Sequence, residues 1–459
     1  MKKIILILTV LTVFSCQNEI DTFNENPNNP TEVTPALLLT QTEVATFNIH
    51  SGDLSRITSL LTQQIAGNDG QYLAYATYTF SETDMDNSWS TLYQNAGLTA
   101  SDNIKKNGAD NPYYSGMSKI LLALNVSKAT DLWNDVPLSK AFQGLTGIIQ
   151  PAYDKQQDVY TQLQQLLDDA IVDLAKPASA NKKIPASDDL IYGGDVSLWT
   201  KAAYTLKARF ALRLTNRDGA TVAANKAITY LAKGMKANSD DMNAVFSADA
   251  SSSWNQWYAF ASARPNYIKM GKYFVDYLVS TSDPRLPRFV AKDADGNFTG
   301  LATNQENNDA SDLGPAIVGS SSDGTSPSKP LGMVTFAEAK FIEAEAKLLT
   351  GDASAQQSFK DAVSASLLNY VGSVDNTFVN TVTTTVSVKS IIEQKYIALF
   401  TNPEVYNDYR RTGFPVLIAN PDVAPSQIPQ RLPTPSNERL YNPNATVVTN
   451  TTSKVWWAL

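Results

Sequence analysis

The chain has 459 residues, a formal net charge of −8, one histidine and one cysteine. An acidic chain without a basic stripe argues against nucleic-acid binding. One histidine and one cysteine cannot form a Cys/His metal cluster, so we predict no metal site and no cofactor. A Ser-His-Asp or Cys-His nucleophile would have to use His50, which we expect to be a loop or capping residue between Asn48 and Gly52.

Residues 1–15 read as a secretory signal peptide. The first three residues form a basic start, and the apolar run 4–14 would reach only roughly 16 Å as a helix, about half of the ~30 Å hydrocarbon core. Cys16 follows a small residue at the end of this run, as in a bacterial lipobox. We predict that residues 1–15 are removed and that Cys16 carries a lipid anchor.

Residues 16–34 are polar and rich in proline and asparagine, so they read as a flexible tether, and 35–459 as a single domain. No apolar run of membrane-spanning length follows the signal, so the lipid on Cys16 would be the only membrane attachment. The acidic residues close behind Cys16 resemble the surface-export signal of Bacteroidetes lipoproteins. We therefore expect a location on the outer membrane, facing the cell exterior.

Helical periodicity dominates the rest of the chain. In 158–174 the apolar residues recur on one face, which Asp168, Asp169 and Asp173 largely avoid. The other helices predicted from this pattern are 35–46, 55–65, 89–106, 113–132, 198–214, 221–231, 268–279, 335–349, 353–370 and 388–400. Helices paired by short turns indicate an α-solenoid, and the small residues of 335–368 match a degenerate tetratricopeptide repeat.

Residues 242–330 are different, because they are rich in Ser, Asn, Asp and Gly and have few periodic runs. We predict a loop-rich, ligand-binding region here. Asp293, Asp295 and Asn297 have the one-three-five spacing of a calcium loop, but the glycine and the final acidic ligand are misplaced, so we predict an Asp-Gly hairpin turn. The run 455–457, which ends in two tryptophans, is expected to dock onto the body.

Short motifs in chain order carry a family resemblance. They are residues 131–139, 151–156, 189–195 with Trp199 and Arg209 behind them, 282–286, 337–346, 410–415 and 428–433. Together with Cys16 they resemble the SusD/RagB family of nutrient-binding outer-membrane lipoproteins of Bacteroidetes, in its SusD-like subgroup. One departure is that Thr434 and Pro435 replace the usual aromatic-proline pair.

The resemblance implies an all-α fold, in which a tetratricopeptide-like helix-pair solenoid packs against a loop-rich, mostly helical half. It implies a protein without catalytic activity that binds oligosaccharides, or peptides in the RagB branch, and delivers them to a SusC-like TonB-dependent barrel. We interpret the motifs themselves as structural, with Asp283 and Arg285 as a local ion pair and Trp199 as a core residue.

Two clusters outside clear helical stripes offer the groups that neutral sugars need, which are aromatic faces and planar polar side chains. They are Asn68, Asp69, Tyr72, Tyr75 and Tyr78 in the first, and Trp254, Trp257, Tyr258, Arg264 and Asn266 in the second. We predict that Trp254, Trp257 and Tyr258 form a stacking platform. The competing interpretation is that the tyrosines pack as in a strand and the tryptophans fill the seam between the halves.

Two other functions stay open from the residues alone. An anchored glycoside hydrolase would need two facing carboxylates about 5–10 Å apart, and no constellation singles out such a pair. Glu343 and Glu345 are two apart on a predicted helix and so do not share a face. A repeat scaffold that binds only protein partners is the other alternative, and exposed aromatic side chains in the loop-rich half would argue against it.

Overall fold

The computed structural model describes residues 33–459, apart from residues 323 and 425–426. The predicted signal peptide, Cys16 and most of the predicted tether lie outside the described residues. Within the described part, none of the helices combines the length and the apolar character that crossing a membrane requires.

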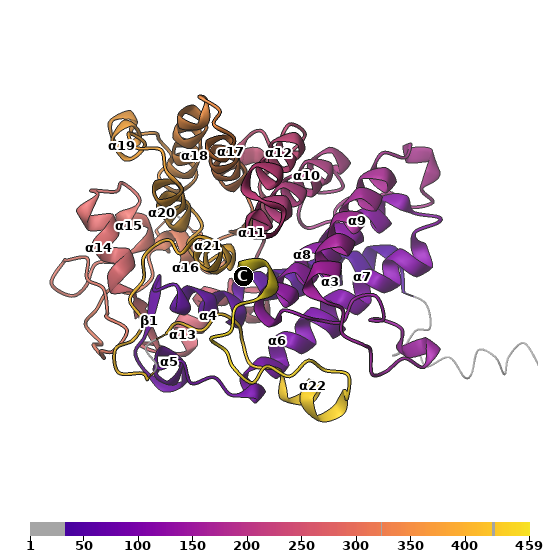
Figure 1. The fold of residues 1–459 in the computed structure, drawn as a ribbon, viewed down its shortest axis with the longest axis horizontal. Coiled ribbons are helices and arrows are strands. Elements are labelled where there is room, and N and C mark those ends of the chain that lie inside the picture. The colour runs from indigo at the N-terminus through magenta and orange to yellow at the C-terminus, as the bar shows by residue number, and fades with distance from the viewer. Residues whose placement is uncertain (1–32, 323, 425–426) are drawn as a thin grey trace, which may run out of the picture.

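An arc of packed helices forms the upper half of the molecule in Figure 1. Its members are α8 (Pro112–Trp133), α9 (Gln156–Leu174), α10 (Val196–Arg213), α11 (Thr215–Asp218), α12 (Ala220–Leu231), α17 (Phe336–Thr350), α18 (Ala355–Tyr370), α19 (Asn376–Val382), α20 (Val388–Ala398) and α21 (Glu404–Thr412). The long helices pack against one another in chain order, α8 on α9, α10 on α12 and α17 on α18. This confirms the predicted tetratricopeptide-like solenoid.

Local chemistry explains where these helices form. Most of the predicted stripe of α9 is buried, from Val159 to Leu174, while Asp168 and Asp169 are exposed. The Asp195 carboxylate begins α10 by accepting hydrogen bonds from the backbone of the first turn. Gly116 lets α8 approach α9 closely, because a Cβ there would lie 2.8 Å from the Leu174 side chain.

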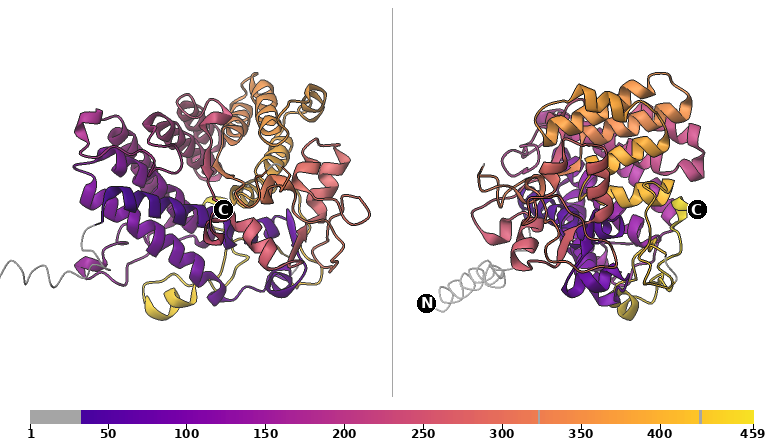
Figure 2. Two further views of the ribbon diagram at one scale, coloured as in Figure 1. Left: turned by 180° about the vertical axis from the view of Figure 1, so that it is seen from behind. Right: turned by 90° about the vertical axis from the view of Figure 1, so that its left-hand side faces the viewer.

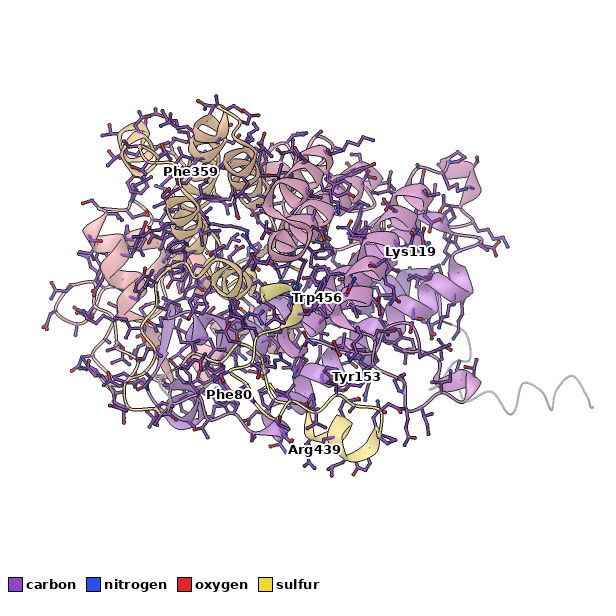
Figure 3. All side chains as sticks on the ribbon, in the orientation of Figure 1. Phe80, Lys119, Tyr153, Phe359, Arg439 and Trp456 are labelled. Atoms are coloured by element: carbon purple, nitrogen blue, oxygen red, sulfur yellow. The ribbon has the colours of Figure 1, made fainter. Side chains whose placement is uncertain are left out.

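The pair α17 and α18 shows the same logic in the later repeat. Thr335 caps α17, and Gly351 ends it with a left-handed backbone that glycine adopts without strain. Phe359, labelled in Figure 3, packs against Phe341 with ring centroids 6.2 Å apart. The buried alanines Ala344 and Ala362 let the two helices approach, as the sequence predicts.

The N-terminal helices pack beneath the arc. They are α3 (Pro35–Ser51), α4 (Asp53–Leu61), α5 (Gly70–Ala76), α6 (Asp86–Ser90) and α7 (Leu98–Asp102), with π-helical turns η2 (Thr91–Gly97) and η3 (Asn103–Asn107). The predicted helix 89–106 is therefore helical throughout, but π turns interrupt it. α3 runs beyond its predicted end and includes His50, so the predicted loop or capping position of His50 is wrong. Burial lowers the pKa of His50 well below its ordinary value, and the positive charges of Lys128 and Arg209 lower it further.

Residues 242–330 contain short elements joined by long loops, and two small antiparallel sheets tie them to the rest. The helices are α13 (Gln256–Ala263), α14 (Lys272–Ser280), α15 (Leu286–Phe289) and α16 (Pro315–Val318). In the sheets, β1 (Ile65–Gly67) pairs with β3 (Ile268–Met270), and β2 (Met242–Ala244) pairs with β4 (Leu331–Val334). The predicted helix 268–279 is wrong at its start, because strand β3 precedes α14.

The remaining elements are short. They are α22 (Ser436–Tyr441) and the 3-10 turns η1 (Glu82–Met85), η4 (Gly144–Thr146), η5 (Ala178–Ala180), η6 (Asn238–Asp240), η7 (Ser251–Ser253) and η8 (Trp456–Ala458). The two views of Figure 2 place the orange helices α17 and α18 at the top of the molecule and the pink loop-rich segment along one side. The fold class thus agrees with the expected solenoid packed against a loop-rich half.

The C-terminal segment returns to the first helix pair. Trp457 is buried and its indole N–H donates to Asp131 of α8 at 2.9 Å. The Leu432 N–H donates to the Leu132 carbonyl, and the Trp133 indole donates to the Pro433 carbonyl at 2.7 Å. The predicted docking of the tryptophan run is therefore confirmed.

Candidate functional site

Helix α13 determines which aromatic residues of the second cluster face inward. The buried Asn255 side chain caps it, accepting from the backbone N–H groups of Trp257 at 2.8 Å and Tyr258 at 3.2 Å. The Asn255 amide also donates to the carbonyls of Ile317 and Lys329, which fixes the start of α13 to two other loops. Residues three apart then share a face, so Trp257 and Phe260 both point into the core.

Trp257 is a core residue, which corrects its predicted place in a stacking platform. Its exposed fraction is 0%, its indole N–H donates to the Ser55 hydroxyl at 3.2 Å, and its ring lies 6.5 Å from that of Phe400. A ligand at the surface cannot contact this indole. The interpretation in which a tryptophan fills the seam between the halves holds for Trp257.

Trp254 and Tyr258 are both half-buried and lie edge to face, with ring centroids 5.4 Å apart. Trp254 lies just before α13 and so escapes the inward face of the helix. Its indole N–H has no hydrogen-bond partner among the described residues. Of the three predicted platform residues, these two therefore keep a part of the ring at the surface.

A groove of about 830 Å³ lies beside Trp254. One wall is the outer face of α3, where Leu37 and Val44 are 63% and 53% exposed, and the other is the segment 245–256. Phe47 and Phe246 meet in an edge-to-face pair within it. Amide and hydroxyl side chains complete the lining, and none of the side chains that line the groove carries a charge.

The sequence-based prediction included only Trp254 of this groove. One signal was available, because the apolar residues of α3 are not confined to one face, and an exposed apolar face marks a binding or packing surface. The second wall could not be found in this way, since it is an irregular segment brought to α3 by the tertiary fold.

Tyr72 and Tyr75 of the first cluster lie on helix α5 and pack inward, and Tyr78 follows the end of this helix. Tyr72 is fully buried, and its hydroxyl accepts a hydrogen bond from Arg56 at 2.9 Å. Burial raises the pKa of Tyr72 to about 12, although Arg56 acts in the opposite direction. Tyr75 is also buried, and the half-buried Tyr78 accepts from the Asn420 backbone N–H at 2.9 Å. The prediction of Tyr72 and Tyr75 as ligand contacts is thus corrected to core packing.

Asn68 joins three loops. It is buried, its amide donates to the Asn266 carbonyl and to Asn308, both at 2.8 Å, and its side-chain oxygen accepts from the Asn307 N–H. Its amide N–H groups and its side-chain oxygen are thus all engaged in tying these loops together. Asp69 is exposed and accepts from the neighbouring Gly70 N–H.

Phe260 brings the two predicted clusters together. Its ring centroid lies 5.0 Å from that of Tyr72, and the guanidinium groups of Arg56 and Arg264 lie 4.4 and 5.6 Å from it. Of the ten residues predicted for the two clusters, Asp69, Arg264 and Asn266 are exposed. The clusters therefore meet as a packed seam with a charged edge, and of their residues Trp254 also lines the uncharged groove.

The segment of the predicted Asp-Gly turn is closed by its own hydrogen bonds. The Asp293 carboxylate accepts from the N–H groups of Asp295 and Asn297, and the Asp293 N–H donates to the Asn297 carbonyl at 2.8 Å. Among the residues that the structure describes, no group of three acidic, histidine or cysteine side chains is arranged to hold a metal ion.

The sequence and the fold were compared with those of known proteins. Residues 27–435 match the SusD-like family, described as starch-binding and associating with the outer membrane. A SusD/RagB family protein from Bacteroides thetaiotaomicron is 22% identical with a TM-score of 0.80, over 93% of this chain and 99% of that one. A chitin-binding SusD homologue from Flavobacterium johnsoniae is 22% identical with a TM-score of 0.77, over 92% and 98%.

A sequence search among curated proteins finds no significant match. The solved structures share the fold, and the family match covers most of the sequence. The family expected from the short motifs is confirmed. The chain belongs to the SusD-like family of non-catalytic, glycan-binding proteins associated with the outer membrane.

Proposed function

We propose that the chain captures an uncharged oligosaccharide in the groove beside Trp254 and delivers it to a SusC-like TonB-dependent barrel. The observation that carries the proposal is the composition of the groove, which combines an aromatic ring, apolar walls and neutral amides and hydroxyls. Sugars need such a mixture, because rings pack on their C–H faces and planar amides bind their hydroxyls.

The uncharged lining favours a glycan over a peptide or an acidic sugar. A charged ligand group would lose water on entering the groove and would meet no counter-charge there. The volume of about 830 Å³ lies within the range of small-molecule sites, roughly 300–1,000 Å³. The alternative ligand is a peptide, as expected for the RagB branch. Its termini and charged side chains would have to lie outside the uncharged groove.

Delivery and anchoring are further parts of the same proposal. The family description supports association with the outer membrane. The lipobox-like Cys16 supports attachment through a lipid, and the family resemblance supports the barrel as the partner.

Titration calorimetry would test the ligand. A soluble form that begins after Asp21 is titrated with malto-oligosaccharides, chito-oligosaccharides and peptides. Binding of an unaltered oligosaccharide, weakened by about tenfold or more in Trp254→Ala, is the expected result, because about 1.4 kcal/mol is a moderate loss for a stacked ring.

Trp456→Ala is the matched control. Trp456 is also a half-buried tryptophan, but it lies on the C-terminal segment, where its ring packs against Arg217 of α11. It is labelled near the middle of the view in Figure 3. Equal loss of affinity in both variants would argue against the groove. Binding confined to peptides would contradict the glycan proposal.

A further inference from the structure

A glutamate is buried in the wall of the groove. Glu43 lies on α3, between the groove residues Gln41 and Val44, and its exposed fraction is 0%. One carboxyl oxygen accepts from the Leu190 N–H at 2.9 Å. The other has no N–H or O–H partner among the described residues.

The group that Glu43 faces is another carboxyl. Asp189 is 2% exposed and directly precedes Leu190, whose N–H Glu43 accepts, so the Asp189 carboxyl lies beside that of Glu43 and acts on its pKa. Asp189 accepts four hydrogen bonds, from the N–H groups of Ile191 and Tyr192 at 3.0 Å, Gly194 at 2.8 Å and the Trp199 indole at 2.7 Å. Both Asp189 oxygens thus already accept from donors, so the unpartnered Glu43 oxygen is the one position of the pair left to carry a proton.

No cation compensates a second negative charge at this place. Burial raises the pKa of Glu43 well above its ordinary value, Asp189 and Asp188 raise it further, and the Leu190 N–H lowers it. On the α8 side, the Tyr114 hydroxyl donates to Asp188 at 2.8 Å and so faces that carboxylate. Among the described residues, no lysine, arginine or histidine forms an ion pair with Glu43, and none is among the groups with the largest effect on its pKa.

We infer that Glu43 is a carboxylic acid at neutral pH and that its proton bridges to Asp189, which fastens the turn 188–194 to α3. The proton gives the otherwise unpartnered Glu43 oxygen its hydrogen bond. Two buried carboxyl groups in contact, without a cation, hold one proton between them.

This contact positions a wall of the groove, an argument that rests on the proposed function. The Thr40 hydroxyl of α3 donates to the Asp188 carbonyl at 2.7 Å, and Thr40 and Leu190 both line the groove. Loss of the Glu43 proton at alkaline pH would place two charges together and push the turn away from α3. Glu43 is therefore a positioning residue for the groove.

The first test compares the stability of Glu43→Gln with that of the parent at several pH values. The glutamine keeps an acceptor for Leu190 and a donor for Asp189. Above about pH 5 the unfolded parent has released the proton that the folded parent keeps, so the parent's folding equilibrium constant should fall about tenfold per pH unit relative to the variant. The fall ends where folded Glu43 itself ionises.

Glu306→Gln is the control, because Glu306 is exposed and its loss should leave the parent's slope unchanged. Infrared spectroscopy should also show a protonated carboxylic acid at neutral pH that disappears in Glu43→Gln. A Glu43→Gln protein that is destabilised and keeps the parent's slope would overturn the inference.

The second test measures oligosaccharide affinity against pH. The parent should lose affinity at alkaline pH while Glu43→Gln keeps it, and identical pH profiles would overturn the positioning role. If neither protein binds any oligosaccharide, the proposed function fails, whereas the stability series still decides whether Glu43 holds a proton.

Discussion

The interior of the helical repeats and the groove beside Trp254 use charge in opposite ways. Glu404, 1% exposed, pairs with both Lys128 and Arg213, and Arg213 also binds Asp131 at 2.8 Å. Burial alone would raise the pKa of Glu404, but Arg213, Lys128 and Arg209 lower it well below its ordinary value. The groove, in contrast, lies at the surface and is lined without a single charged side chain.

The difference shows what each region must achieve. The ionic cluster joins α8, α10 and α21, and its ion pairs form only when these three helices are aligned as they are here. In the proposed function, the groove has to release water and accept a neutral molecule, and a charged side chain there would hold water more firmly. The following variants either break one region or test whether the two are independent.

The largest effect is expected from Glu404→Ala. The substitution leaves Lys128 and Arg213 buried without their shared partner, and breaking a buried pair costs about 3–5 kcal/mol. Denaturant unfolding should show this loss. Lys182→Ala, which breaks an exposed pair with Asp110, should change stability by no more than about 1 kcal/mol. Similar losses in the two variants would contradict the central role of the buried cluster.

The two tryptophans of the second cluster should separate stability from binding. Trp257→Ala empties a fully buried site and should cost about 3 kcal/mol or more in unfolding free energy. Trp254→Ala should cost about 1 kcal/mol, because the ring is only half-buried, yet it should remove most of the oligosaccharide affinity. Unfolding curves and calorimetry on both variants check this, and the reverse pattern would refute the assignment of the groove.

Asp241 provides a pH-dependent effect inside the scaffold. Burial, and then Asp240 and Glu338, raise its pKa to about 7, although the Phe336 N–H that it accepts acts in the opposite direction. A raised carboxyl pKa means that the folded state holds a proton between about pH 4 and 7 that the unfolded state releases, so stability falls as pH rises through this window.

Asp241→Asn keeps the acceptor for Phe336 and removes the titration. At pH 8 it should be more stable than the parent by about 1–3 kcal/mol, with a smaller difference at pH 4. Thermal unfolding at the two pH values measures this. The exposed Asp309→Asn should show no such pH-dependent difference, and a constant difference for Asp241→Asn would exclude the raised pKa.

The smallest change in stability is expected from a charge placed in the groove. Val44→Asp alters an exposed residue and should change unfolding free energy by about 0.5 kcal/mol or less, while affinity for a neutral oligosaccharide falls about tenfold. Val222→Asp, equally exposed on α12 but outside the groove, is the matched control. Unchanged affinity in Val44→Asp would show that the ligand does not contact this wall of the groove.

The helices could be predicted because periodicity is a local property. The stripe of α9 and the small residues of α17 and α18 needed no knowledge of distant segments. Helix α5 was missed because it has only seven residues and begins at a glycine. The end of α3 was placed too early because Ile49 is the one apolar residue among 48–51, too few to show a helical period, although the surrounding fold buries most of this turn.

The candidate site was predictable only in part. Asn255 is a typical N-cap residue, and a helix that begins after it places Trp257 and Phe260 on one inward face. The groove itself joins α3 to residues about 200 positions later, and such a contact leaves no local pattern. The Glu43 and Asp189 pair is equally invisible, since an acidic residue among apolar neighbours usually indicates a helix surface.

The return of the C-terminal segment to α8 has a mechanical consequence. An open solenoid can stretch and recoil like a spring, because each repeat touches only its neighbours. Here Leu432 and Trp457 tie the far end of the arc to its first helix pair, so extension of the arc would first have to break these buried contacts. A pulling force should therefore meet a stiff ring that yields in one abrupt event.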